Sequence, residues 1–258
     1  MTGLVINLDA CHAMREAILV SKLKIAKQLI NLSPGSGAGW IIDGGCHIGR
    51  FSGNAVKEFP ASRVLAFEPD PDSWACAQKN LCSHRQVEIV KAALGAEKKQ
   101  AEFFRGPIPV TNSLLPRPSE GMKPYYPEQA YLKGGCLVDV VTLDEECEKR
   151  GITDIDLFKL DLQGGELLAL DGVNKLLGSN AIKVIITEAV FVRKYQDQPL
   201  LWELWQRLET YGYSLFSLMD IKVGLYHPEE PGLRQMQWNQ CDAIFISSPI
   251  RAAMDKSQ

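Results

Sequence analysis

Apolar residues along the chain alternate between short continuous runs and helically spaced stretches. The continuous runs are typical of strands buried on both faces of a parallel sheet. They lie at residues 40–43, 63–67, 87–90, 156–161, 182–187, 213–218 and 241–247. Between them, spacing of three or four residues predicts helices at 51–58, 71–81, 166–177 and 200–211. The alternation predicts a doubly wound α/β fold, whose mostly parallel seven-stranded sheet has helices on both faces.

Two stretches stand apart from this alternation. An apolar stripe over residues 9–31 predicts an N-terminal helix that packs on the sheet or covers its ligand end, so we take residues 1–39 as a helical extension with its linker and 40–258 as the main domain. A proline-rich insertion at about 105–136 lies between short strands predicted at 101–104 and 137–143. Such insertions are typically functional lids or covered loops, and Gly134-Gly135 would be the hinge.

A glycine-rich turn follows the first predicted strand. Asp43, Gly44 and Gly45 end that strand, and Gly49 opens the next helix. Glycines there let the backbone approach a ligand, and helix N–H groups point at whatever lies above the strand. Glu68, which ends the second predicted strand, is placed to accept hydrogen bonds from both hydroxyls of a ribose. The pair predicts a cofactor that contains a nucleoside, and a tight turn without a ligand is the alternative.

The spacing of the glycines discriminates between cofactors. A dinucleotide fingerprint needs G-x-G-x-x-G, but Cys46 and His47 follow Gly45. A phosphate-binding loop needs Gly-Lys-Ser/Thr, and Gly49 is followed by arginine and phenylalanine. Asp43 would repel phosphates but suits a cationic amino group. S-adenosylmethionine, which has an amino acid end, a ribose and no phosphate, fits better than NAD or ATP.

Further blocks of sequence give the chain a family resemblance. They are Val141-Thr-Leu-Asp144, Asp156-Leu-Phe-Lys159-Leu-Asp161-Leu-Gln163-Gly164-Gly165-Glu166, Leu170-Asp-Gly172, Ile186-Thr-Glu188 and Asp242-Ala-Ile-Phe245. With the glycine turn and Ala-Phe-Glu68-Pro69, they make residues 40–247 resemble the FkbM family of S-adenosylmethionine-dependent methyltransferases. The resemblance implies a class I, Rossmann-like methyltransferase fold and O-methylation of natural products or sugars. Two departures are Cys46-His47, where the family usually has alanine and asparagine, and Gln163, where it often has glutamate.

We expect the cofactor to be held by residues of the strand ends and of the insertion. They are Asp43, Gly44, Gly45, Cys46, His47, Gly49, Glu68, Pro69, Ala92, Ser113 and Asp161, with Ser113 assigned through the resemblance.

The candidate catalytic residues are Asp161, Glu188 and His47. A hydroxyl is a weak nucleophile, so a general base is expected, and Asp161 and Glu188 end neighbouring predicted strands. Their alternative role is to cap a helix or bind the amino group of the cofactor, and that of His47 is a backbone role in the turn. Glu166 is either an orienting acid or a partner of the helix dipole. Lys159 is expected to be structural, paired with Glu166 or Glu188.

Composition and charge limit the classes of partner that we expect the protein to bind. The chain has 258 residues, a net charge of −3 and no long basic run, which argues against nucleic acid as a partner. No apolar segment is long enough to span a bilayer, so we expect no membrane insertion. Seven scattered cysteines without a C-x-x-C pair indicate a reducing, cytoplasmic setting.

The expected acceptor is a small molecule, and homo-oligomerisation stays open. A divalent metal held by Asp161, Glu166 and Glu188 is an alternative that we do not favour, because carboxylate clusters also occur in metal-free crevices. The competing functions are an N-methyltransferase that acts on an amine, a non-catalytic cofactor-binding scaffold, and an NAD-dependent oxidoreductase, against which the glycine spacing argues.

Overall fold

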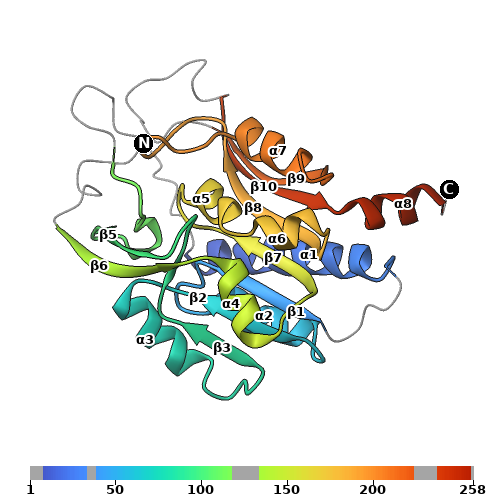
Figure 1. Ribbon diagram of the computed structural model, residues 1–258. Helices are drawn as coiled ribbons and strands as arrows, with labels where there is room; N and C mark the ends of the chain where they lie inside the picture. The colour runs from blue at the N-terminus through green and yellow to red at the C-terminus, as the bar shows by residue number, and fades with distance from the viewer. Residues whose placement is uncertain (1–7, 34–38, 118–133, 224–236, 257–258) are drawn as a thin grey trace.

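A seven-stranded sheet forms the centre of the protein (Figure 1), whose computed structural model describes residues 8–33, 39–117, 134–223 and 237–256. The strands lie in the order β3-β2-β1-β7-β8-β10-β9. Their bounds are Trp40–Gly44 (β1), Arg63–Phe67 (β2), Val87–Val90 (β3), Ile155–Leu160 (β7), Ile182–Val190 (β8), Ser214–Val223 (β9) and Trp238–Ile246 (β10). β10 runs antiparallel to both of its neighbours, β8 and β9. The doubly wound, mostly parallel sheet predicted from the sequence is confirmed.

Helices cover both faces of this sheet. Their bounds are Leu8–Ile30 (α1), Arg50–Glu58 (α2), Pro71–Asn80 (α3), Leu143–Arg150 (α4), Glu166–Asp171 (α5), Asn174–Gly178 (α6), Leu201–Glu209 (α7) and Ser248–Lys256 (α8). Consecutive strand residues point to opposite layers, so Ile41 packs with α1 and α2 while Ile42 packs with the layer of α4–α7. Because both faces are buried, the strands read as continuous apolar runs.

A smaller three-stranded sheet lies beside the main one. It is made of β4 (Ala93–Leu94), β5 (Lys99–Arg105) and β6 (Gly134–Val141), in the order β4-β6-β5. Gly134 and Gly135 pair with Arg105 and Phe104 across the antiparallel β5–β6 ladder. The predicted hinge is therefore part of a paired strand. Of the predicted insertion, residues 118–133 lie outside the described residues.

The helices of the second half differ from the sequence prediction. The expected helix at 166–177 is broken into α5 and α6 at Gly172, where the backbone lies so close to Gly95 that a Cβ on residue 172 would be 2.0 Å from the Gly95 carbonyl oxygen. The Asp144 carboxylate then caps α6 by accepting hydrogen bonds from the amides of Lys175 and Leu176, at 2.8 and 3.2 Å. α8 and α4 were not predicted, although Thr142-Leu-Asp-Glu carries a capping pattern at the start of α4.

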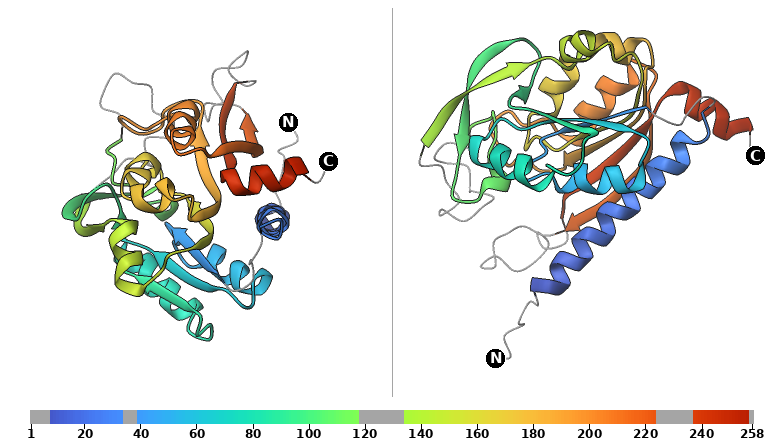
Figure 2. Two further views of the ribbon diagram at one scale, coloured as in Figure 1. Left: turned by 45° about the vertical axis from the view of Figure 1, so that its right-hand side comes forward. Right: turned by 90° about the horizontal axis from the view of Figure 1, so that it is seen from below.

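α1 crosses the face of the sheet that also carries α2 (Figure 2). Leu23, Ala26 and Ile30 are buried against that face. Lys22 forms an ion pair with Asp242 of β10, with 2.6 Å between Nζ and Oδ2. Among the described residues, no helix is long and apolar enough to cross a membrane.

Candidate functional site

A cavity of about 930 Å³ lies at the carboxyl ends of the central parallel strands. Ligands of open α/β sheets bind at this edge. The cavity is lined by residues from α1, the turn after β1, the ends of β2, β7 and β8, the η1 turn (Pro109–Thr111), β9 and β10. It therefore reaches from β2 across β1 and β7 to β8 and β10.

Close backbone packing explains the glycines of the turn after β1. Gly45 has a φ of +76°, and a Cβ there would lie 2.1 Å from the carbonyl oxygen of Asp161. Gly49 has a φ of +85°, and its Cβ would meet the Leu81 side chain at 2.6 Å. The amides of Gly45 and Cys46 donate to the carbonyl of Phe67, at 3.1 and 2.9 Å. The turn is thus pressed between the ends of β2 and β7.

Asp43 is buried beneath this turn and is bound to groups of the protein. Its Oδ2 accepts a hydrogen bond from Ser52 Oγ at 2.6 Å, and its Oδ1 lies 3.0 Å from Nζ of Lys159. Lys159 also donates to the carbonyls of Gly44 and Gly45, at 3.0 and 2.8 Å. Burial alone would lower the pKa of Lys159, but the negative charges of Asp43 and Asp161 and the hydrogen bond to Asp43 together hold that pKa above its usual range.

The expected pairing of Lys159 with Glu166 or Glu188 is wrong. Lys159 lies directly opposite Asp43 in the parallel β1–β7 register, which places both side chains on the same face of the sheet. The cation beside Asp43 is consequently a lysine of the protein.

Glu68 ends β2 and lines the cavity. Its Oε2 accepts a hydrogen bond from the amide of His47 at 2.7 Å, and its Oε1 accepts one from the amide of Asp70 at 2.9 Å. Burial raises the pKa of Glu68 to about 7, against the lowering effect of these two amides. His47 has a left-handed backbone with a φ of 50°, and burial lowers the pKa of its imidazole. Its amide is therefore committed to orienting Glu68.

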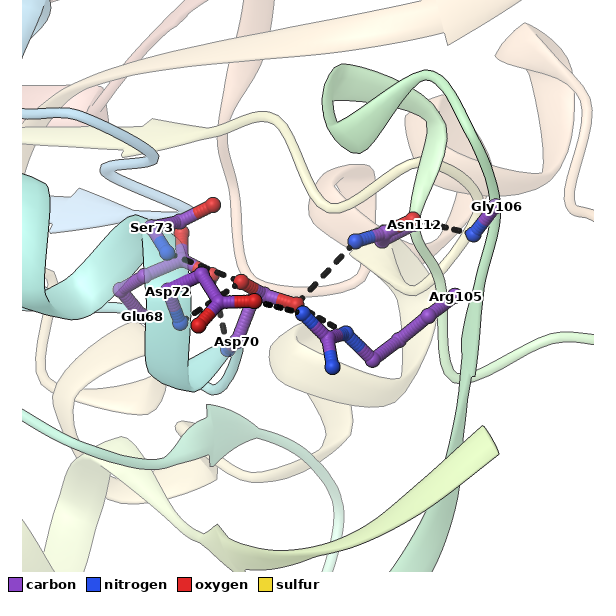
Figure 3. A network of polar contacts seen from close by, with 7 residues as sticks. All are labelled: Glu68, Asp70, Asp72, Ser73, Arg105, Gly106 and Asn112. Atoms are coloured by element: carbon purple, nitrogen blue, oxygen red, sulfur yellow. Dashed lines mark hydrogen bonds and ion pairs between the residues drawn. The ribbon is translucent and has the colours of Figure 1, made fainter. Parts of the chain in front are cut away.

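A polar network centred on Asp70 links the start of α3 to Arg105 and Asn112 (Figure 3). Oδ1 of Asp70 caps α3 by accepting from the amides of Asp72 and Ser73, at 3.0 and 2.8 Å. Its Oδ2 accepts from Nε of Arg105 at 2.6 Å and from Nδ2 of Asn112 at 3.2 Å. Residues 108–112, which line the cavity, are thereby tied to the start of α3.

The structure brings Asp161 and Glu188 together through a glutamine. Nε2 of Gln163 donates to Oδ1 of Asp161 at 2.8 Å and to Oε2 of Glu188 at 3.1 Å. Nε2 of Gln240 donates to Oε1 of Glu188 at 2.7 Å, and Oε1 of Gln240 contacts Nζ of Lys194. Burial and the Asp161 charge raise the pKa of Glu188 above its usual range.

Two other predicted residues hold the loop that carries Gln163. Glu166 is buried, and its carboxylate accepts from the amides of Leu162 and Gly164, at 2.8 and 3.0 Å. Burial raises the pKa of Glu166 to about 7. Oγ of Ser113 donates to the carbonyl of Gln163 at 2.7 Å. Neither side chain lines the cavity. Within the described ranges, no group of three or more histidine, cysteine or acidic residues is arranged to hold a metal ion.

The structure divides the predicted site residues into two groups. Those that line the cavity are Gly45, Cys46, His47, Glu68, Pro69, Ala92, Asp161 and Glu188. The residues that do not line the cavity but pack against or hydrogen-bond to the elements around it are Asp43, Gly44, Gly49 and Ser113. Sequence reasoning missed the roles of Asp70, Arg105, Asn112 and Gln240, of which Asp70 alone has a local signal, since an aspartate before a proline commonly caps a helix.

The chain is similar in sequence to known methyltransferases. The chain is 29% identical over 161 residues to methyltransferase sdnD of Sordaria araneosa. That alignment covers 53% of this chain and 61% of sdnD. It is 25% identical over 184 residues to 2-O-methyltransferase NoeI of Sinorhizobium fredii, covering 70% and 72% of the two chains. The alignment thus spans less than two thirds of sdnD. A crystal structure of precorrin-6y C5,15-methyltransferase from Geobacter metallireducens aligns with a TM-score of 0.44, at 16% identity, over 87% of this chain and 88% of that chain.

Residues 43–215 match the model of the methyltransferase FkbM domain. This match covers more than half of the 258 residues. The resemblance inferred from the sequence motifs is confirmed: the chain belongs to the FkbM family of S-adenosylmethionine-dependent methyltransferases.

Proposed function

We propose that this protein transfers a methyl group from S-adenosylmethionine to a hydroxyl of a small molecule, such as a sugar or another natural product. The observation that carries the proposal is one continuous cavity, which joins Glu68 at the end of β2 to Asp161 and Glu188 at the ends of β7 and β8. The carboxylate that would bind the ribose hydroxyls, Glu68, and the carboxylates that could take a proton, Asp161 and Glu188, thus line the same cavity. The name of the relative NoeI, a 2-O-methyltransferase, supports a hydroxyl as the methyl acceptor.

The residues present fit the cofactor. Each oxygen of Glu68 accepts one backbone hydrogen bond, so the carboxylate retains lone pairs for the two ribose hydroxyls. The walls of the same cavity include the apolar residues Ala92, Leu94 and Phe103, which suit a flat base. When bound, S-adenosylmethionine supplies an electrophilic methyl group on a sulfonium sulfur.

The proton of the acceptor hydroxyl is assigned to Asp161. This side chain is exposed at the end of β7, and Gln163 orients its Oδ1. Both oxygens of Glu188 already accept hydrogen bonds, from the amides of Gln163 and Gln240, which leaves Asp161 as the base. The remaining catalysis comes from holding the acceptor oxygen in line with the methyl group.

A calorimetric titration with S-adenosylhomocysteine tests the cofactor, with NADH as the control. Micromolar binding of S-adenosylhomocysteine alone supports the proposal, and absence of binding refutes it. A screen of sugars, phenols and amines with radiolabelled S-adenosylmethionine then tests the acceptor. Labelled amines without labelled alcohols would assign N-methylation instead, and tight binding without turnover on any acceptor would favour the scaffold.

A further inference from the structure

Gln163 occupies the space between the two carboxylates of the site. Its Nε2 lies 2.8 Å from Asp161 Oδ1 and 3.1 Å from Glu188 Oε2. An amide nitrogen carries two hydrogens, so each carboxylate receives one of them. The contact joins the ends of β7 and β8 at the wall of the cavity.

The orientation of this amide is determined by its surroundings. The amide oxygen, Oε1, lies 3.1 Å from the hydroxyl of Tyr195, which is almost fully buried and also reaches the carbonyl of Thr111 at 2.9 Å. In the flipped orientation, Oε1 would face two carboxylates, which have no hydrogen to donate when ionised. The orientation with the NH₂ group toward Asp161 and Glu188 is therefore the one that gives each carboxylate a donor.

The backbone of Gln163 is held in a conformation that glutamine rarely adopts. Its φ is 52°, in the left-handed region, and such a residue persists only where the surrounding structure over-determines it. Ser113 Oγ binds the carbonyl of Gln163 at 2.7 Å. The Glu166 carboxylate binds the amides on either side, those of Leu162 and Gly164. The loop is thus preorganised to present this one side chain.

Charge explains why a donor is needed here. Glu188 faces acidic groups from several elements, namely Asp161, Glu166 and Asp242, and one cation, Lys194. Carboxylates this close repel one another unless a proton, a cation or a hydrogen-bond donor lies between them. Lys194 contacts Gln240 on the side of Glu188 away from Gln163. On the side of Asp161, the amide of Gln163 supplies the donor.

We infer that Gln163 is a positioning residue whose amide takes the place of a cation between Asp161 and Glu188. The inference rests on the proposed function, because it assigns how the acceptor end of the same cavity is held. It also gives a role to one of the two departures from the family pattern. A glutamate at this position would complete a cluster of three carboxylates, which are ligands that a hard divalent cation prefers.

The test compares the wild type with Gln163→Glu and with the matched control Gln100→Glu. Gln100 also donates its amide to a carboxylate, Asp139 at 3.3 Å, but it is exposed on β5 and does not line the cavity. Thermal unfolding of the three proteins is followed from pH 5.5 to 8.5, with and without MnCl₂. Calorimetry with S-adenosylhomocysteine is run on each protein.

The expected deficit of Gln163→Glu grows with pH. Near pH 5.5 protons relieve the repulsion, and by pH 8.5 the melting temperature should fall roughly 4–8 °C below that of the wild type. Mn²⁺ should restore at least half of that loss while leaving the wild type and Gln100→Glu unchanged. A deficit that does not vary with pH, no deficit at pH 8.5, or equal stabilisation of the wild type by Mn²⁺ would overturn the inference.

The calorimetry distinguishes a failure of the inference about Gln163 from a failure of the proposed function. Gln163→Glu should bind S-adenosylhomocysteine within about threefold of the wild type, because Gln163 lies at the acceptor end of the cavity. Loss of binding in that variant alone would make Gln163 a cofactor residue and overturn the inference. Loss in the wild type as well would refute the proposed function, and the unfolding curves would still decide whether the amide replaces a cation.

Discussion

Lys159→Met removes the ammonium beneath the glycine turn and keeps a side chain of similar length. The ammonium lies 3.0 Å from Asp43 Oδ1 and donates to the carbonyls of Gly44 and Gly45. Asp43 is fully buried, and in the variant its remaining hydrogen-bond donor among the described residues is Ser52. The substitution therefore leaves a buried carboxylate without its charge partner.

The expected loss of stability is large. Breaking a buried ion pair by removing one partner typically costs about 3–5 kcal/mol. The two carbonyls lose a charged donor at the same time, so we expect the upper half of this range, or a fall in melting temperature of roughly 8–20 °C for a chain of this size.

Urea unfolding at pH 7.5, followed by circular dichroism, measures this loss. In the double variant with Asp43→Asn, the orphaned charge is removed too, and at least about 2 kcal/mol should be regained relative to Lys159→Met alone. Lys175→Met is the control, because its ion pair with Glu148 is exposed and should contribute at most about 1 kcal/mol. A loss below about 1 kcal/mol for Lys159→Met, or simple additivity in the double variant, would refute the reasoning.

Two further predictions concern the cofactor end of the cavity. Glu68 has a pKa of about 7, so it is mostly protonated at pH 6 and mostly ionised at pH 8. The affinity for S-adenosylhomocysteine should rise about tenfold over this interval, because the ionised form accepts the ribose hydroxyls better. Glu68→Gln should flatten the calorimetric profile, and an equal rise in that variant would assign the titration to another group. Gly45→Ala should destabilise the fold by about 2–4 kcal/mol, since its Cβ would meet the Asp161 carbonyl at 2.1 Å with a φ of +76°. Gly53→Ala, whose Cβ would make an ordinary 3.5 Å contact in α2, should be neutral or stabilising in the same urea assay.

Local pattern was enough to place most strands and helices. The apolar run at 182–187 predicts a central strand, and β8 extends it to Val190 because the antiparallel ladder with β10 continues through residues 188–190. Pro71 marks the first turn of α3, as expected from its missing amide hydrogen. The break between α5 and α6 was not predictable, because it depends on the approach of Gly95 to Gly172.

The sequence predicted that the candidate site lies at the carboxyl edge of the sheet, but it did not predict which side chains contact one another there. Asp161 and Glu188 were expected together because neighbouring parallel strands present their carboxyl ends at one edge. The pairing of Lys159 was mispredicted because its partner, Asp43, lies 116 residues earlier and becomes a neighbour only through the β1–β7 register. The bridging role of Gln163 depends likewise on Tyr195 and Ser113, which are distant in sequence.

The sequence by itself determined the types of the main elements, the position of the glycine turn and the identity of the family. These depend on steric and hydrogen-bonding preferences within a few residues, which leave a periodic pattern in the chain. Only the tertiary structure decided that β10 runs antiparallel between β8 and β9, and which buried charge meets which partner. Such pairings follow from strand order and register, because residues far apart in sequence meet only when the sheet has formed.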